Sequence, residues 1–316
     1  MKKPITLATV LMLSLLCSCA NTENTATQIH FDTAVTLTAD CSDEILNAAF
    51  SLCENYDKTL SRTNKNSEIS SLNGGNEKVS PDTLEIIKKG VYYSALTKGK
   101  FDITVADLVS LWSFKDEVVP SRDEISEALK NVDYESVKVI TDSVDAGGKK
   151  IDLGGIAKGF VSDKLLDFFK QKGVKKGIIN LGGNVTVFGD RFYNIGIKKP
   201  FSESDTLATV KLKNKSVSTS GIYERYFKSG GELYHHILDT KTGYPVKTDL
   251  LSASVIGATS ADCDALSTIC VIYGLRDAKK LIEGTAGFEA VFVDKNYKVI
   301  LTKGLENKNG IIEFKN

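Results

Sequence analysis

The order of apolar and polar residues along the chain predicts short strands that alternate with amphipathic helices. Thr33–Ala39 alternates side chains in the period of two that is typical of a strand. Residues 42–60 repeat apolar side chains every three or four positions, which indicates a helix. Ser80-Pro81 predicts the start of another helix, because serine is a good N-cap and proline fits the first turn, and Lys98-Gly99 marks its end.

The second half of the chain is richer in strand patterns. Helices are expected over residues 260–273 and 275–283, and a hairpin is expected over 288–302. Runs of strands separated by helices favour the α+β class, with largely antiparallel sheets flanked by helices. Further strands are expected at residues 177–181, 185–189, 193–197, 206–212 and 251–257.

The N-terminus has the pattern of an export signal. Two lysines precede an apolar run over residues 5–16, which is shorter than the ~20 residues of a membrane span but typical of a secretory signal. The run ends in L-C-S-C, the bacterial lipoprotein pattern, with Cys19 as the lipidated residue. We therefore expect a signal peptide at 1–18, a polar tether at 19–30 and one folded domain at 31–316, exported and anchored by lipid to the periplasmic or extracytoplasmic face of a membrane. A plain signal cut elsewhere and a buried apolar helix are the alternatives.

Charge and cysteine content remove several classes of function. The 40 basic and 40 acidic residues balance, so the chain lacks the basic field that nucleic acid requires. With three histidines and neither C-x-x-C nor H-E-x-x-H, a zinc site is not expected. Cys263 and Cys270 fall seven residues apart in a helical pattern, roughly 10 Å along the axis. That separation is too long for a disulfide, so both are expected to be small buried residues.

A glycine-rich turn is the first candidate for chemistry. Residues 151–163 read I-D-L-G-G-I-A-K-G-F-V-S-D, in which a short apolar run ends at Asp152 and two glycines lead into a helix. Glycine permits a close approach to a ligand, helix N-termini attract anions, and Lys158 adds a positive charge. The spacing matches neither the P-loop nor the dinucleotide fingerprint. The segment therefore predicts either a phosphate-binding turn or an ordinary turn between a strand and a helix.

Two further groups could take part in chemistry. Asp264 and Thr268 are four residues apart on a predicted helix, so they share one face. Both offer hard oxygen ligands, which suit Mg²⁺, although a carboxylate near a helix N-terminus also stabilises the helix dipole. His235 and His236 point to opposite faces of an extended strand. One of them could act as a base near neutral pH, or one could be buried and the other solvated.

Eight sequence blocks in one order carry a family resemblance. After the lipoprotein pattern, the chain contains F-D-T, S-R-T with S-E-I-S-S-L-N, G-K-F-D-I-T, I-D-L-G-G-I-A-K-G-F, N-L-G-G-N, S-V-S-T-S-G, H-I-L-D-T-K-T-G-Y-P-V and C-D-A-L-S-T. From about Phe31 to the C-terminus this combination resembles the ApbE family, the FAD:protein FMN transferases.

The resemblance implies an activity and a metal site. Family members use Mg²⁺ and FAD, transfer FMN to a threonine or serine hydroxyl of an acceptor protein, and release AMP. Their targets carry a D-G-x-T-G-A-[ST] type of motif. The metal would be held by Asp264, by Thr268 and by the backbone carbonyl of Gly155. Asp264 would thus be catalytic, together with His236 as the base for the acceptor hydroxyl.

The resemblance also implies the FAD contacts. By position in the matching blocks they are Lys100, Phe101, Asp102, Asp152, Lys158 and Ile237, with Phe31, Thr63 and Asn73 in the N-terminal third. Many relatives have M-G-T where this chain has F-D-T, and an aromatic residue where it has Thr63. Two other functions are compatible with these blocks: an Mg²⁺-dependent FAD pyrophosphatase that gives FMN and AMP, and a flavin-binding lipoprotein without turnover.

Overall fold

The computed structural model describes residues 23–75 and 77–315. The predicted signal peptide and Cys19 lie outside these residues. The helices are α1 (Asp43–Leu60), α2 (Glu68–Asn73), α3 (Pro81–Leu96), α4 (Ala106–Leu111), α5 (Arg122–Leu129), α6 (Ala157–Gln171) and α7 (Ser260–Glu283), with a 3₁₀ turn at Tyr134–Ser136. The strands are β1 (Asn24–His30), β2 (Thr33–Ala39), β3 (Lys138–Ile140), β4 (Ser143–Asp145), β5 (Gly177–Leu181), β6 (Asn184–Phe188), β7 (Tyr193–Lys198), β8 (Thr206–Leu212), β9 (Lys215–Gly221), β10 (Tyr226–Ser229), β11 (Glu232–His235), β12 (Leu250–Gly257), β13 (Glu289–Asp294), β14 (Val299–Leu301), β15 (Leu305–Lys308) and β16 (Ile311–Phe314).

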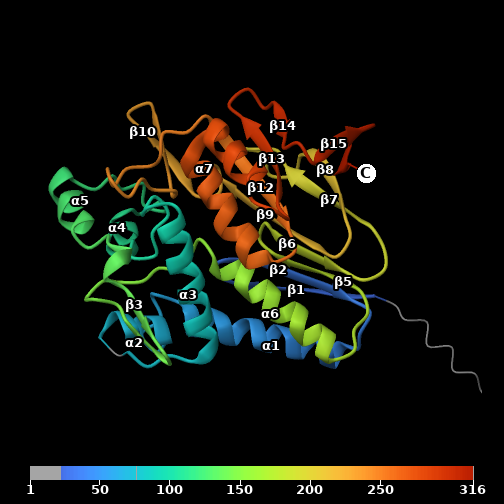
Figure 1. The fold of residues 1–316 in the computed structure, drawn as a ribbon, viewed down its shortest axis with the longest axis horizontal. Coiled ribbons are helices and arrows are strands. Elements are labelled where there is room, and N and C mark those ends of the chain that lie inside the picture. The colour runs from blue at the N-terminus through green and yellow to red at the C-terminus, as the bar shows by residue number, and fades with distance from the viewer. Residues whose placement is uncertain (1–22, 76, 316) are drawn as a thin grey trace, which may run out of the picture.

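An eight-stranded antiparallel sheet forms the centre of the fold. Its strand order is β1-β2-β5-β6-β9-β12-β13-β14, and α6 and α7 pack against it side by side (Figure 1). A second sheet, ordered β15-β16-β8-β7, contains a parallel pair, β16 with β8. The prediction of largely antiparallel sheets flanked by helices is therefore confirmed.

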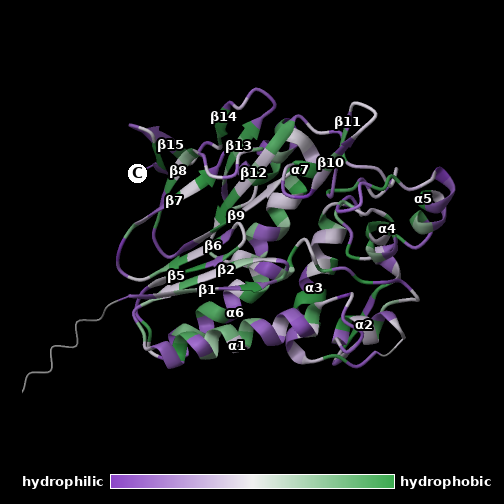
Figure 2. Ribbon diagram, turned by 180° about the vertical axis from the view of Figure 1, so that it is seen from behind, coloured by the Kyte–Doolittle hydropathy of each residue, from purple (hydrophilic) through white to green (hydrophobic). Residues whose placement is uncertain are grey.

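Separate clusters of buried side chains join these layers. The main cluster fills the space between the helices and the large sheet, and Phe160, Leu165 and Phe169 of α6 belong to it. A second cluster joins the two sheets, through Val217 of β9 and Val210 of β8. A third surrounds Trp112 beside α4, α5 and the β10–β11 hairpin. Figure 2 shows the apolar residues along the strands and on the helix faces that contact them.

The expected polar tether at residues 19–30 is wrong for its second part. Asn24–His30 forms β1, the edge strand of the large sheet, and pairs with β2 from Asn24↔Ala39 to His30↔Thr33. Backbone pairing joins β1 to β2, and hydroxyl contacts, such as Thr27 Oγ1 to Thr36 Oγ1 at 2.8 Å, add to it. Because most of its side chains are exposed, β1 has no apolar alternation by which it could have been predicted.

Helix α7 contains a break where two helices were expected. Gly274 lies between them with φ 73°, a left-handed conformation that favours glycine. Cys263 and Cys270 are buried free thiols, as their spacing predicts. Within the described part of the chain, no helix has the length and apolar character needed to cross a bilayer.

Candidate active site

Serine side chains of β9 orient two residues of α7. Ser218 and Ser220 lie on the same face of the strand because side chains alternate. The Ser218 hydroxyl donates to Asp264 Oδ1 at 3.2 Å, and Ser220 Oγ lies 2.9 Å from Thr268 Oγ1. Ser267 Oγ contacts both serines, at 3.4 and 2.8 Å. Asp264 and Thr268 therefore face β9 together, as their spacing predicts.

The glycine turn approaches the same region from α6. The Gly159 N–H donates to Asp264 Oδ2 at 3.0 Å. In a regular helix this N–H would reach the carbonyl of Gly155, four residues earlier. Within residues 23–75 and 77–315 no hydrogen bond to the Gly155 carbonyl is found. The Gly155 carbonyl thus has no donor in the described part of the chain, and it lies one helical turn before the Gly159 N–H, which donates to the Asp264 carboxylate.

Asp264 is a buried carboxylate without a basic partner. It is 4% exposed, and no lysine or arginine of the described residues forms an ion pair with it. Burying an unpaired charge is costly, so this site favours a bound cation. Across the described chain no three His, Cys, Asp or Glu side chains form a metal cluster. The oxygen groups that could hold a cation here are the Asp264 carboxylate, the Thr268 hydroxyl and the Gly155 carbonyl, which are of the type that Mg²⁺ accepts when water or phosphate completes its coordination.

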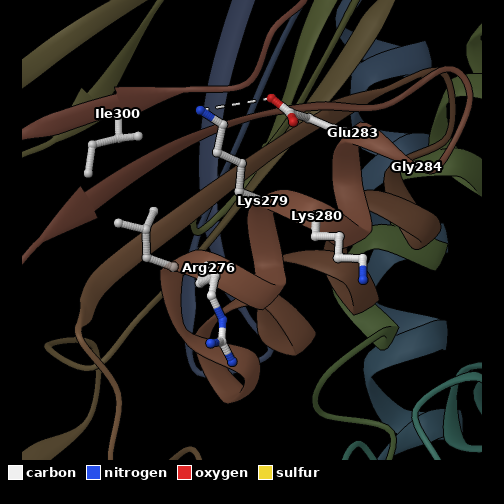
Figure 3. Close-up of a pocket in the computed structure, with 7 residues that line it drawn as sticks. Arg276, Lys279, Lys280, Glu283, Gly284 and Ile300 are labelled. Atoms are coloured by element: carbon white, nitrogen blue, oxygen red, sulfur yellow. Dashed lines mark ion pairs between the residues drawn. The ribbon is translucent and has the colours of Figure 1, made fainter.

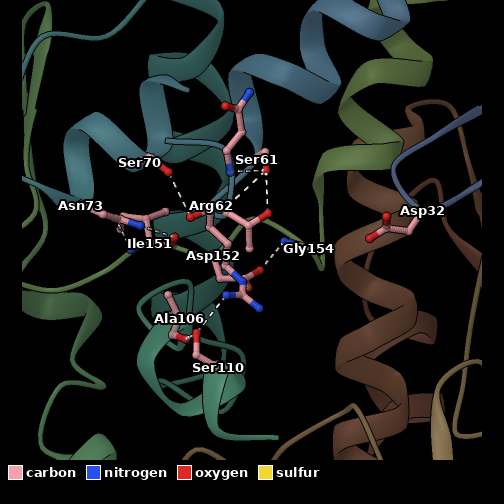
Figure 4. A network of polar contacts seen from close by, with 12 residues as sticks. Asp32, Ser61, Arg62, Ser70, Asn73, Ala106, Ser110, Ile151, Asp152 and Gly154 are labelled. Atoms are coloured by element: carbon pink, nitrogen blue, oxygen red, sulfur yellow. Dashed lines mark hydrogen bonds and ion pairs between the residues drawn. The ribbon is translucent and has the colours of Figure 1, made fainter. Parts of the chain in front are cut away.

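Asp152, at the start of the glycine turn, forms an ion pair with Arg62 and a hydrogen bond within the turn. Arg62 Nε lies 2.6 Å from Asp152 Oδ2, and the Gly154 N–H donates to Asp152 Oδ1 at 2.7 Å (Figure 4). Asn73 bonds to Ile151 twice, since its Nδ2 donates to the carbonyl and its Oδ1 accepts from the N–H. The predicted FAD residue Asn73 therefore fixes the backbone next to Asp152.

The Phe101 block lies directly against the turn. A Cβ at Gly155 would stand 2.8 Å from Phe101 Cε2, so glycine is required for this approach. Asp102 is 7% exposed and accepts from the Thr104 N–H and hydroxyl, at 2.8 and 2.6 Å, so it holds the loop in place. Burial raises the pKa of Asp102. Lys100 is exposed and its Nζ lies 4.8 Å from the centre of the Tyr273 ring.

The charges of Arg225 and Lys158 act on His236. Its N–H donates to the Arg225 carbonyl at 3.1 Å, and its buried Nδ1 has no partner among the described residues. Burial, together with the charges of Arg225, His235 and Lys158, lowers the pKa of His236 to about 3. His235 is 4% exposed, and burial lowers its pKa to about 4. His235 is thus the buried member of the pair, and His236 is the one beside Lys158.

Three predicted residues have weaker links to this region. Thr63 is exposed and bonds to Ser61 of its own loop. Phe31 has φ 52° in the β1–β2 turn, and its N–H donates to Asp57 Oδ2 at 3.1 Å. Ile237 is 5% exposed, and its carbonyl accepts from the Val246 N–H at 2.9 Å. Of these, Ile237 adjoins His236, whereas Thr63 makes no contact with another predicted site residue within the described chain.

Sequence reasoning missed four residues that shape the site: Arg62, Gly159, Ser218 and Ser220. The alternation of serines at 216, 218 and 220 was a usable signal, because one strand face then carries only hydroxyls. An open pocket of about 550 Å³ lies elsewhere, along the second half of α7 (Figure 3). It is lined by Arg276, Lys279 and Glu283, among others, and contains none of the predicted site residues.

Comparison with known proteins identifies the family of this chain. The family model described as "ApbE family" matches residues 27–292. An FAD:protein FMN transferase of Klebsiella pneumoniae is 32% identical over 82% of this chain and 85% of its own length. The homologue from Treponema pallidum, with the same name, is 28% identical over 85% of this chain and 82% of its own.

Solved structures give the same result. The ApbE protein of Thermotoga maritima superposes with a TM-score of 0.82 at 30% identity, over 89% of this chain and 97% of that one. The Pseudomonas stutzeri flavinyl transferase ApbE gives 0.77 at 26% identity, over 89% and 95%. From the ordered blocks, the antiparallel fold and these matches together, the chain belongs to the ApbE family.

Proposed function

We propose that this protein is an FAD:protein FMN transferase that depends on Mg²⁺. The observation that carries the proposal is Asp264, a buried carboxylate without a basic partner that accepts from the Gly159 N–H, four residues after the Gly155 carbonyl, which has no donor among the described residues. Two relatives that match over four fifths of the chain carry this activity in their names. Mg²⁺ bound by Asp264, Thr268 and the Gly155 carbonyl would neutralise charge on the diphosphate of FAD.

The reaction exchanges one phosphorus–oxygen bond for another. The hydroxyl oxygen of an acceptor threonine or serine attacks the phosphorus on the FMN side of FAD. The bond between that phosphorus and the bridging oxygen breaks, and AMP leaves. The ammonium group of Lys158 would hold phosphate oxygens. His236 would accept the proton of the hydroxyl.

Because charged groups act on His236, binding of FAD would change the basicity of this histidine. In the free protein the cationic neighbours Arg225 and Lys158 favour the neutral imidazole. A diphosphate beside Lys158 would offset that positive charge and raise the pKa of His236. The histidine would thereby become a stronger base only when the donor substrate is in place.

A mass measurement separates this function from the two alternatives. The protein without its signal peptide is incubated with FAD, Mg²⁺ and a peptide bearing the D-G-x-T-G-A-[ST] type of motif, with an active relative as control. A transferase adds the mass of FMN to the peptide and releases one AMP for each. A pyrophosphatase releases AMP and free FMN without the peptide, and a pure binding protein leaves FAD intact. Either of these last two results rejects the proposal.

The location of the protein is proposed from its first residues. The L-C-S-C pattern supports lipidation at Cys19 and attachment to the outer face of a membrane, where an acceptor protein would be met. In cells, the unaltered chain should partition into detergent and a Cys19→Ser variant into the aqueous phase. Equal partitioning of the two would reject the anchor.

A further inference from the structure

Helices α6 and α7 contact each other through two carboxylates. Each helix supplies one carboxylate, which accepts hydrogen bonds from the backbone of the other helix. Asp163 of α6 accepts from the Ser260 N–H at 2.8 Å and from the Ala261 N–H at 2.9 Å. Asp264 of α7 accepts from the Gly159 N–H of α6 at 3.0 Å. Gly159 and Asp163 are four residues apart, as are Ser260 and Asp264, so each helix uses one face for both contacts.

The first turn of α7 depends on Asp163 because its own N-cap residue does not cap it. Thr259 stands at the N-cap position without a side-chain bond to the helix backbone, and its hydroxyl donates to Asp262. Helix N-termini leave N–H groups without partners, and a carboxylate satisfies them well. Here that carboxylate comes from another helix, so capping α7 also fixes its position relative to α6.

The two helices have little freedom to shift at this point. A Cβ at Gly159 would lie 2.3 Å from the Ser260 carbonyl oxygen and 2.7 Å from Asp264 Cβ. The helices therefore touch backbone to backbone between the two carboxylate contacts. Burial raises the pKa of Asp163 to about 6, and its two N–H donors oppose that shift. At neutral pH the carboxylate remains mostly ionised and can accept both hydrogen bonds.

We propose that Asp163 is a positioning residue for the metal site, because it holds α7 against α6 so that Asp264 and Thr268 face the Gly155 carbonyl. The inference rests on the proposed metal-dependent function. Asp163 contacts neither of the two side chains nor the carbonyl. It acts through the helix whose second and third turns carry Asp264 and Thr268.

The chain offers a matched control on the same helix. Beyond the break at Gly274, the Leu275 N–H donates to Asp249 Oδ1 at 2.8 Å. Asp249 thus caps the second half of α7, as Asp163 caps the first half, and it lies outside the candidate site. Asp249→Ala removes a cap from α7 without touching its contact with α6.

The test compares Asp163→Asn, Asp163→Ala and Asp249→Ala with the unaltered protein. Four quantities are measured: Mg²⁺ affinity by calorimetry without FAD, the half-saturating Mg²⁺ concentration for FMN transfer, kcat for FMN transfer, and hydrogen exchange of the Gly159 amide. Asparagine keeps one acceptor oxygen and the shape of aspartate, so Asp163→Asn should fold even where Asp163→Ala does not.

For Asp163→Asn we expect weaker Mg²⁺ binding by about tenfold, since an altered ligand geometry costs roughly one order of magnitude. kcat at saturating Mg²⁺ should change by less than the Mg²⁺ affinity does. The Gly159 amide should exchange faster than in the unaltered protein. Asp249→Ala should lower the melting temperature and leave all four quantities unchanged. Normal Mg²⁺ affinity and normal Gly159 protection in folded Asp163→Asn would overturn the positioning role alone. An unaltered protein that neither binds Mg²⁺ nor transfers FMN would reject the proposed function, and this inference with it.

Discussion

At the scale of single residues, the site is built from close approaches that only small side chains allow. Gly155 lies under the Phe101 ring, and Gly159 lies against the backbone of α7. Both glycines stand in the turn that sequence reasoning selected. The sequence pattern identified the turn, but the helix against which it packs begins about a hundred residues later, and spacing alone does not supply that contact.

Gly159→Ala tests the close approach directly. The added methyl would meet the Ser260 carbonyl and Asp264 Cβ, so α7 must move away from α6. We expect a loss of roughly 1–3 kcal/mol in the free energy of unfolding, as for other overpacked sites, and weaker Mg²⁺ binding. Denaturant unfolding and calorimetry measure the two effects. Gly284→Ala, at the C-cap of α7 with φ −90°, is the control and should leave Mg²⁺ affinity unchanged.

The two adjacent histidines predict a pH dependence of stability. Burial lowers the pKa of His235 to about 4 and that of His236 to about 3, below the ordinary value near 6.5. Between pH 6.5 and pH 4 the unfolded chain therefore binds more protons than the folded protein, and stability falls as the pH falls. Urea unfolding across this range should show the decline. His235→Gln should flatten it, and an equal slope in that variant would contradict the assignment.

At the scale of elements, strand β9 orients Asp264 and Thr268 of α7. Its alternate serines face α7, whereas Thr219 faces the other way, with its Oγ1 2.7 Å from Ser254 Oγ. In the sequence this stretch was recognised only as one of the eight blocks that carry the family resemblance. The structure shows instead that Ser218 and Ser220 contact side chains of the site.

Ser220→Ala should separate the effect of this contact from general stability. Without the hydroxyl, Thr268 and Ser267 lose a common partner, and a higher Mg²⁺ concentration should be needed for half-maximal turnover. The loss in unfolding free energy should be about 1 kcal/mol, as for one hydrogen bond. Thr219→Val removes a hydroxyl from the opposite face of the same strand. If both variants need the same raised Mg²⁺ concentration, the contact to Thr268 is not the cause.

Most elements were predictable, and the exceptions share a physical cause. β2 and β8 match their expected bounds, and the capping serine of α3 was recognised because local side-chain chemistry determines those features. β1 was missed because an exposed edge strand depends on backbone pairing rather than on apolar alternation. The pairing of Arg62 with Asp152 was missed for a related reason, since it joins segments ninety residues apart.

At the scale of the whole molecule, β1 determines where the folded domain begins. Seven residue pairs join it to β2, and Glu23 just before it bonds to Arg191 at 2.7 Å. The domain therefore starts about seven residues earlier than the sequence pattern predicted.

Two truncations test this boundary. A chain that starts at Glu23 should melt at the same temperature as one that starts at Cys19, because it keeps β1 and the Glu23 contact. A chain that starts at Phe31 exposes the edge of β2 and should melt several degrees lower, as expected for a loss of one to two kcal/mol in a domain of this size. Circular dichroism during heating measures both, and equal melting temperatures would show that β1 adds nothing to stability.

The most direct test of the account is a crystal structure of the protein with Mn²⁺ in place of Mg²⁺ and with FAD bound. The account predicts one anomalous scattering peak in contact with the Asp264 carboxylate, the Thr268 hydroxyl and the Gly155 carbonyl, with the FAD diphosphate on its open side. A peak at another place, or these three oxygens too far apart to share one ion, would contradict it.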